Sequence, residues 1–114
     1  MAIRITKPWR PLAAEEVRRV QAQLGIYEIA DADGTVLFIG YAGGRAIFGL
    51  RGLLLEEIEK ARPGAAQFRI EVNQQYLSRQ HELLMVYQAD HGELPRDNAA
   101  GELRPRVLGR LSPA

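Results

Sequence analysis

The chain has 114 residues, of which 46% are hydrophobic and 25% charged, with a formal net charge of +1, as is usual for one soluble globular domain. It contains no cysteine, which excludes disulfides, thiolate nucleophiles and cysteine-ligated zinc and suits the reducing cytoplasm. No apolar stretch is long enough to cross a membrane, and residues 1–12 lack the apolar core of a signal peptide, so we expect a cytoplasmic protein without a membrane partner.

The first half of the chain is predicted to form a helix followed by a hairpin. Apolar residues recur at three- and four-residue spacing over residues 13–24, which predicts a helix that ends at Gly25. Residues 26–31 and 35–40 are expected to be strands, because a two-residue turn signal, Asp33-Gly34, lies between them.

The second half adds a helix, a strand and a longer helix. A helix is expected over about residues 49–61, a third strand over residues 67–72 and a long helix over about residues 75–90. Residues 92–114, with several prolines and glycines, are expected to be irregular chain packed on the domain. The fold class is therefore α/β (α+β), with a small, three-stranded, mainly antiparallel sheet flanked by helices.

The charges are unevenly distributed along the chain. Residues 1–24 carry five basic and two acidic side chains, and residues 99–114 carry three and one. Residues 25–98 carry seven basic and eleven acidic side chains. Because tight binding of nucleic acid usually needs a broad basic surface, we expect weak binding that depends on the two ends; the alternative is that the ends are ordinary solvated tails.

Two tripeptides flank the predicted hairpin turn. Gly25-Ile26-Tyr27 opens the first strand, and Phe38-Ile39-Gly40 ends the second after ten intervening residues. With phenylalanine in place of the second tyrosine, this pair resembles the signature of the GIY-YIG nuclease family, whose order of hairpin, helix, strand and helix matches residues 25–98. We therefore expect a single domain over residues 1–114, with the family-like residues 25–98 as its core, an N-terminal helix over 13–24 and an irregular C-terminal tail over 99–114.

The resemblance also implies a catalytic set. Arg51 stands near the start of the second predicted helix, Glu82 lies in the last helix, and Asn98 ends the segment Pro95-Arg96-Asp97-Asn98, as in the family. The implied activity is that of a divalent-metal-dependent endonuclease. In it Tyr27 would activate or orient the attacking water, Arg51 would neutralise charge in the transition state, Glu82 would hold Mg²⁺ or Mn²⁺, and Asn98 would assist.

Each of these residues also has an ordinary structural interpretation. Tyr27 fits a half-buried strand tyrosine packed on a helix, and Asn98 fits a polar loop. Arg51 lies on the apolar side of a first helical turn, where a positive charge is unfavourable unless it binds an anion such as phosphate or pairs with a carboxylate such as Glu82. Glu82 itself fits a surface pair with Arg79, three residues before it.

Three further residues are expected to contact phosphate or nucleic acid: Tyr41, Arg45 and Arg79. Two functions then remain open. The first is the endonuclease, which the Tyr-Arg-Glu-Asn set favours. The second is a catalytically inactive domain that binds nucleic acid or a protein, which includes a second copy of the chain. The missing hydroxyl at Phe38 and the acidic residues of 25–98 favour this second function.

Overall fold

The hairpin joins the two tripeptides at a single pair of opposed residues. In the computed structural model, which describes residues 3–101, β2 (Gly25–Ala30) pairs antiparallel with β3 (Val36–Ala42), and Tyr27 lies directly opposite Gly40. The Asp31 carboxylate closes the turn by accepting hydrogen bonds from the N–H groups of Asp33 and Thr35, both at 2.9 Å. A Cβ at Gly40 would come within 2.5 Å of the Tyr27 ring, so this close approach requires glycine.

The sheet has one strand more than the sequence predicts. β4 (Gln67–Val72) pairs antiparallel with β2, and β1 (Arg10–Pro11) pairs with β4, which gives the order β1-β4-β2-β3. The expected α+β class with an antiparallel sheet is confirmed. The fourth strand was not predicted because two residues, one of them proline, contain no alternation to detect.

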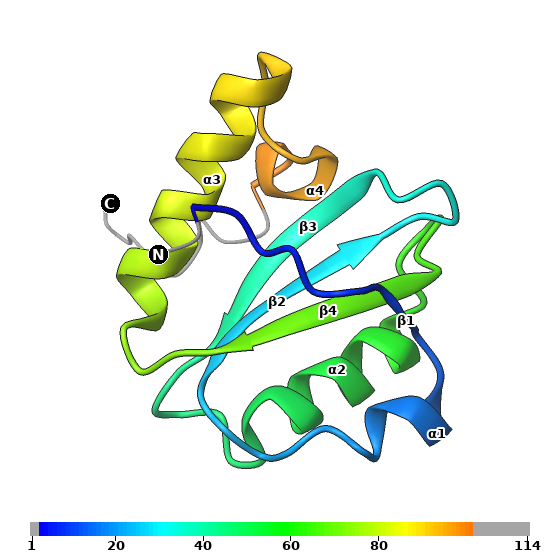
Figure 1. Ribbon diagram of the computed structural model, residues 1–114. Helices are drawn as coiled ribbons and strands as arrows, with labels where there is room; N and C mark the ends of the chain where they lie inside the picture. Colours follow the sequence, from blue (N-terminus) through cyan, green and yellow to red (C-terminus); the bar gives the residue numbers. More distant parts are fainter. Residues whose placement is uncertain (1–2, 102–114) are drawn as a thin grey trace.

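Strand alternation gives the sheet two apolar faces, and each is covered by helix (Figure 1). One face carries Tyr27, Ile29 and Phe68 and packs on α2 (Gly49–Lys60) and the residues around α1 (Ala14–Val17). The opposite face carries residues such as Ile26 and Ile39, packs on α3 (Tyr76–His91) and is crossed by the N-terminal segment. The two long helices therefore lie on opposite faces.

The predicted helix over residues 13–24 is wrong in length. Only Ala14–Val17 is α-helical, although Val17 and Val20 are buried as its stripe predicted. The chain beyond it is held by other elements, because the Gln23 carbonyl accepts from Leu50 N–H and the Leu24 carbonyl from Asn73 N–H. These tertiary hydrogen bonds replace the helical ones that the local pattern predicts.

The chain after α3 contains a short helix where irregular chain was expected. Gly92, at φ 82°, ends α3, and α4 (Arg96–Ala99) follows Pro95. The rest of the predicted tail, residues 102–114, lies outside the described residues. Among residues 3–101, no helix is both long and apolar enough to cross a membrane.

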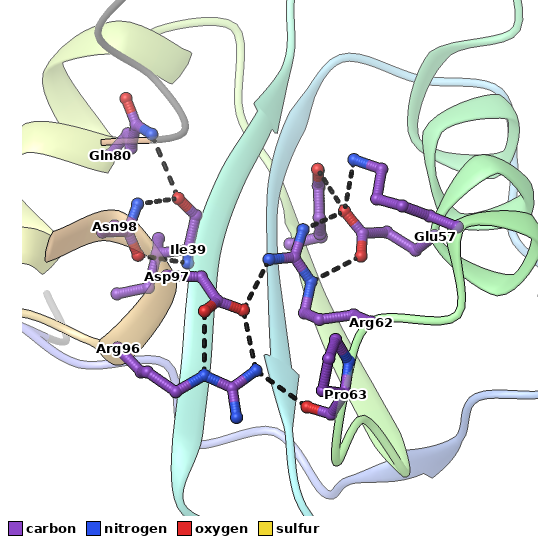
Figure 2. A network of polar contacts seen from close by, with 10 residues as sticks. Ile39, Glu57, Arg62, Pro63, Gln80, Arg96, Asp97 and Asn98 are labelled. Atoms are coloured by element: carbon purple, nitrogen blue, oxygen red, sulfur yellow. Dashed lines mark hydrogen bonds and ion pairs between the residues drawn. The ribbon is translucent and has the colours of Figure 1, made fainter. Parts of the chain in front are cut away.

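The side chain of Asn98 covers the outer edge of β3 (Figure 2). Its Oδ1 accepts the Ile39 N–H at 2.8 Å, and its Nδ2 donates to the Ile39 carbonyl at 3.0 Å. Gln80 from α3 donates to the same carbonyl at 3.1 Å. The amide thus pairs with the edge residue as a further strand would, and it anchors α4 against the sheet.

Replacing Asn98 should destabilise the fold by more than an ordinary polar contact would. In Asn98→Ala the buried Ile39 N–H loses its acceptor, so the free energy of unfolding should fall by about 1–3 kcal/mol. In Gln80→Ala the Ile39 carbonyl keeps its bond from Asn98, so the loss should be smaller. Urea unfolding measures both, with the exposed Gln88→Ala on α3 as the control. An Asn98→Ala loss no greater than that of the control would contradict this role.

Candidate functional site at the edge of the sheet

An open groove of 850 Å³ crosses the edge strand β3 and reaches both helix layers; we call it the edge groove. Its floor includes Tyr27, Phe38 and Gly40 on the α2 face of the sheet. Its walls come from α2, from the loop that precedes α2 and from the first turns of α3, with the main side chains Tyr41, Arg45, Leu53, Glu56, Lys60 and Tyr76.

Two tyrosines stack at the α3 end of the groove. The rings of Tyr41 and Tyr76 lie 5.5 Å apart with an interplanar angle of 17°. The Tyr76 hydroxyl accepts the Gly44 N–H at 3.2 Å, and a Cβ at Gly43 would come within 2.8 Å of the Tyr76 ring. The loop at Gly43 and Gly44 therefore packs closely against the Tyr76 ring. Arg45, in the same loop, is exposed and has no side-chain partner among residues 3–101.

A buried ion pair lies at the α2 end of the groove (Figure 2). Glu57 is 1% exposed, and Arg62 binds both of its carboxylate oxygens, Nε to Oε1 at 2.8 Å and Nη2 to Oε2 at 2.7 Å. The Tyr27 hydroxyl lies 3.4 Å from Oε2, and Lys60 Nζ lies 3.5 Å from it. Ala61 ends α2 at φ 52°, a left-handed conformation that directs Arg62 back toward the sheet.

Phe38 supports the same arginine. The Arg62 guanidinium carbon lies 4.2 Å from the centre of the Phe38 ring, a cation–π contact, and the Tyr27 and Phe38 rings lie 6.0 Å apart. Arg62 Nη1 also binds Asp97 Oδ2 at 2.8 Å, which links α2 to α4. Phe38, which stands where the GIY-YIG signature has its second tyrosine, therefore packs beneath a buried arginine.

Of the four residues of the predicted catalytic set, only Tyr27 lines the edge groove. Tyr27 lines the edge groove, but Arg51 does not; it is about 200° around α2 from Leu53, which does. The Glu82 side chain is 46% exposed and hydrogen-bonds Arg79. Asn98 binds the backbone of β3 as described above.

The three predicted nucleic-acid contacts also separate. Tyr41 and Arg45 line the edge groove. Arg79 does not: it is 7% exposed, and it binds both oxygens of Glu71 at 2.8 and 3.0 Å and the Ile3 carbonyl at 2.9 Å. Its role among the described residues is to hold β4, α3 and the N-terminal segment together.

The basic N-terminal residues lie away from the edge groove. Arg10 belongs to β1, at the opposite edge of the sheet from β3, and binds Glu16 at 2.7 Å. Arg4 binds Asp90 at 2.7 Å on the α3 face. Arg104, Arg106 and Arg110 lie outside the described residues. The N-terminal charges therefore do not extend this groove.

The side chains at the groove do not fit the metal that the resemblance implies. Glu82, the expected ligand, does not line the groove. Glu57 does, but Arg62 holds both of its oxygens. Within residues 3–101 there is no group of three His, Cys, Asp or Glu side chains placed to hold a metal ion.

Glu57 and Arg62 were missed by the sequence analysis, although a signal was present. Leu50, Leu54 and Glu57 lie on one face of α2, so an acidic residue interrupts the stripe that faces the core. A carboxylate at such a position is expected to have a buried cationic partner. The sequence does not identify Arg62 as that partner, because it follows the helix in a turn.

The fold is that of a small α+β domain in which both helix layers line a groove at the β3 edge of the sheet. The chain matches the family model described as a domain of unknown function, DUF7508, over residues 2–90, and it belongs to that family. No curated protein and no solved structure gives a significant match. The matched residues include the whole lining of the edge groove, whereas α4 lies beyond them.

Removing Arg62 should strongly destabilise the protein. Arg62→Met leaves a buried carboxylate without its main partner, so the free energy of unfolding should fall by about 3–5 kcal/mol. The double variant Glu57→Leu, Arg62→Met removes both charges and should recover most of that loss. Urea unfolding measures both variants. Lys60→Met, which removes only the exposed cation near Glu57, is the control, and a similar loss there would contradict the assignment.

The pKa of Asp97 should depend on Arg96. Hydrogen bonds from Arg96 and then Arg62 lower this pKa, against the effect of burial. Since folding lowers it, the carboxylate stabilises the fold above its unfolded pKa of about 3.9, and this contribution is lost as the pH falls through the lower folded value. Carboxyl NMR titration should show that Arg96→Gln raises the Asp97 pKa.

A reciprocal variant controls this measurement. Arg4 lowers the pKa of Asp90 by hydrogen bonding. Arg4→Gln should therefore raise the pKa of Asp90 and leave that of Asp97 unchanged. If each variant shifts both carboxyl groups equally, the local hydrogen bonds are not the cause.

Proposed function

We propose that the chain is a nucleic-acid-binding domain that holds a single-stranded segment in the edge groove and does not cleave it. The observation that carries the proposal is the stacked pair of Tyr41 and Tyr76 beside Arg45, in a groove open to solvent. Aromatic rings that stack on bases, together with cations that bind the backbone, are the usual means of holding single strands.

The charge of the groove supports a single strand over a duplex. Arg45 and Lys60 line it together with Glu56, and the charge of Glu57 is offset by Arg62. Two cations provide about two phosphate contacts, which is little for a ligand bound mainly through its phosphates. Stacking on Tyr41 and Tyr76 supplies affinity that does not depend on charge.

The arrangement around Tyr27 supports binding over cleavage. The Tyr27 hydroxyl faces a carboxylate that Arg62 already holds, and Phe38 brings no second hydroxyl. Arg51, Glu82 and Asn98 do not line the edge groove in which Tyr27 lies. The endonuclease hypothesis needs these groups around one phosphate, so the binding hypothesis is the better supported of the two.

Anisotropy of a fluorescein-labelled oligothymidine tests the proposal. Tyr41→Leu should weaken binding about fivefold or more, because one stacked base contributes about 1–3 kcal/mol. Arg45→Gln should reduce the slope of log K against log salt by about 0.7. Arg51→Gln makes the same charge change on the other side of α2 and should leave both quantities unchanged.

Two outcomes would overturn the proposal. If the oligothymidine does not bind even at low salt, the groove is better explained by a protein partner. If plasmid or oligonucleotide is cleaved with Mg²⁺ or Mn²⁺ and Glu82→Ala abolishes cleavage, the endonuclease hypothesis is the correct one.

A further inference from the structure

A second cleft, of 470 Å³, lies on the opposite face of the sheet from Tyr27; we call it the α3 cleft. It is enclosed by β2 and β3, by the last turns of α3, by the hairpin turn and by the N-terminal segment that Figure 1 shows crossing this face. Its volume falls within the range of about 300–1,000 Å³ that is usual for small-molecule sites. Its apolar walls are Ile5, Val36, Ile39, Leu83 and Val86.

One carboxylate, Glu28, lines this cleft from the middle of β2. It is 4% exposed, and Arg69 Nε binds its Oε1 at 2.7 Å. Arg69 is itself fixed, since its guanidinium lies 4.0 Å from the Trp9 ring centre and donates to the Lys7 carbonyl at 3.4 Å. No group within residues 3–101 donates a hydrogen bond to Glu28 Oε2.

Stability alone does not account for this carboxylate. A buried charge is costly, and an apolar pair in place of a buried ion pair is often at least as stable. Burial raises the pKa of Glu28 even though Arg69 opposes that shift. The ionised group is therefore less favourably placed in the folded chain than in water, and a cationic ligand would relieve that cost.

The charges around the cleft favour a cation over an anion. Three carboxylates line it, Glu28, Asp33 and Asp90, against two guanidiniums, Arg4 and Arg69. Arg4 is already paired with Asp90, and Arg69 with Glu28. Among the lining residues, Asp33 is therefore the carboxylate without a paired guanidinium, and Glu28 Oε2 is the buried acceptor without a donor.

The hydroxyl of Tyr87, which also lines the cleft, responds to the same negative potential. Its pKa is raised, first by burial and then by the carboxylates of Glu93, Asp31 and Glu28. The acceptor Oε2 of Glu28 and a negative potential thus lie beside the apolar walls of the α3 cleft, as in many small-molecule sites.

We propose that the α3 cleft binds a small organic ammonium, whose charged nitrogen pairs with Glu28 Oε2 and whose apolar body packs on Ile39, Leu83 and Val86. The α3 cleft shares no lining residue with the edge groove, and this proposal does not depend on the nucleic-acid hypothesis.

Titration of the full chain with three isosteric probes tests this proposal: phenethylamine, 2-phenylethanol and phenylacetate. Phenethylamine should produce saturable NMR shifts of the Leu83 and Val86 methyl groups. The neutral alcohol should bind at least about tenfold more weakly, because a hydrogen bond to a charged group contributes about 1.5–3 kcal/mol. Phenylacetate should bind most weakly of the three.

Variants locate the contact. Glu28→Gln keeps the size of the side chain and an acceptor for Arg69 but should weaken phenethylamine binding about tenfold. Glu59→Gln removes an exposed carboxylate on α2 that does not line the cleft, and it should leave the affinity unchanged. If Glu28→Gln fails to fold, Val86→Trp fills the cleft while Glu28 remains and should also abolish binding. Absence of phenethylamine binding, equal binding of the alcohol, or preference for phenylacetate would overturn the proposal.

Discussion

The ion pair between Glu57 and Arg62 is the interaction on which the edge of this domain depends. Two fully buried charges are tolerated because the guanidinium binds both carboxylate oxygens, lies on the Phe38 ring and reaches Asp97 with its remaining nitrogen. One arginine thereby joins α2, the hairpin and α4. Loss of this arginine would leave the Glu57 carboxylate isolated in the core. The pair therefore couples the packing of α2, the hairpin and α4.

The same pair limits which groups of the edge groove are available to a ligand. Tyr27 lies between Gly40 and Glu57, so its hydroxyl faces a carboxylate that is already paired with Arg62. The outward backbone groups of Ile39 in β3 already hydrogen-bond the amide side chains of Asn98 and Gln80. The groups that remain available in the groove are the rings of Tyr41 and Tyr76 and the charged side chains of Arg45, Glu56 and Lys60, and the proposed function rests on them.

Strand alternation separates the side chains that line the two proposed sites. Tyr27 and Glu28 are neighbours in sequence, yet one lines the edge groove and the other lines the α3 cleft. Each carries its own buried carboxylate–arginine pair, Glu57 with Arg62 and Glu28 with Arg69. A ligand in one cleft need not disturb the other, so the two proposals can be tested separately.

The sequence by itself determined the hairpin, α2, β4 and α3, because each has a local signal: alternation, a turn at Asp33-Gly34, or a helical stripe. Tyr41 and Arg45, which were expected to contact nucleic acid, line the same groove as Tyr27, and that role stays a prediction. Only the tertiary structure decided the rest. The segment after Val17 leaves the helix because its carbonyls bond to α2 and to the residue after β4. Arg51, Glu82 and Asn98 do not line the groove with Tyr27. Their side-chain directions are set by helix rotation and by pairing with the sheet edge, and not by spacing along the chain.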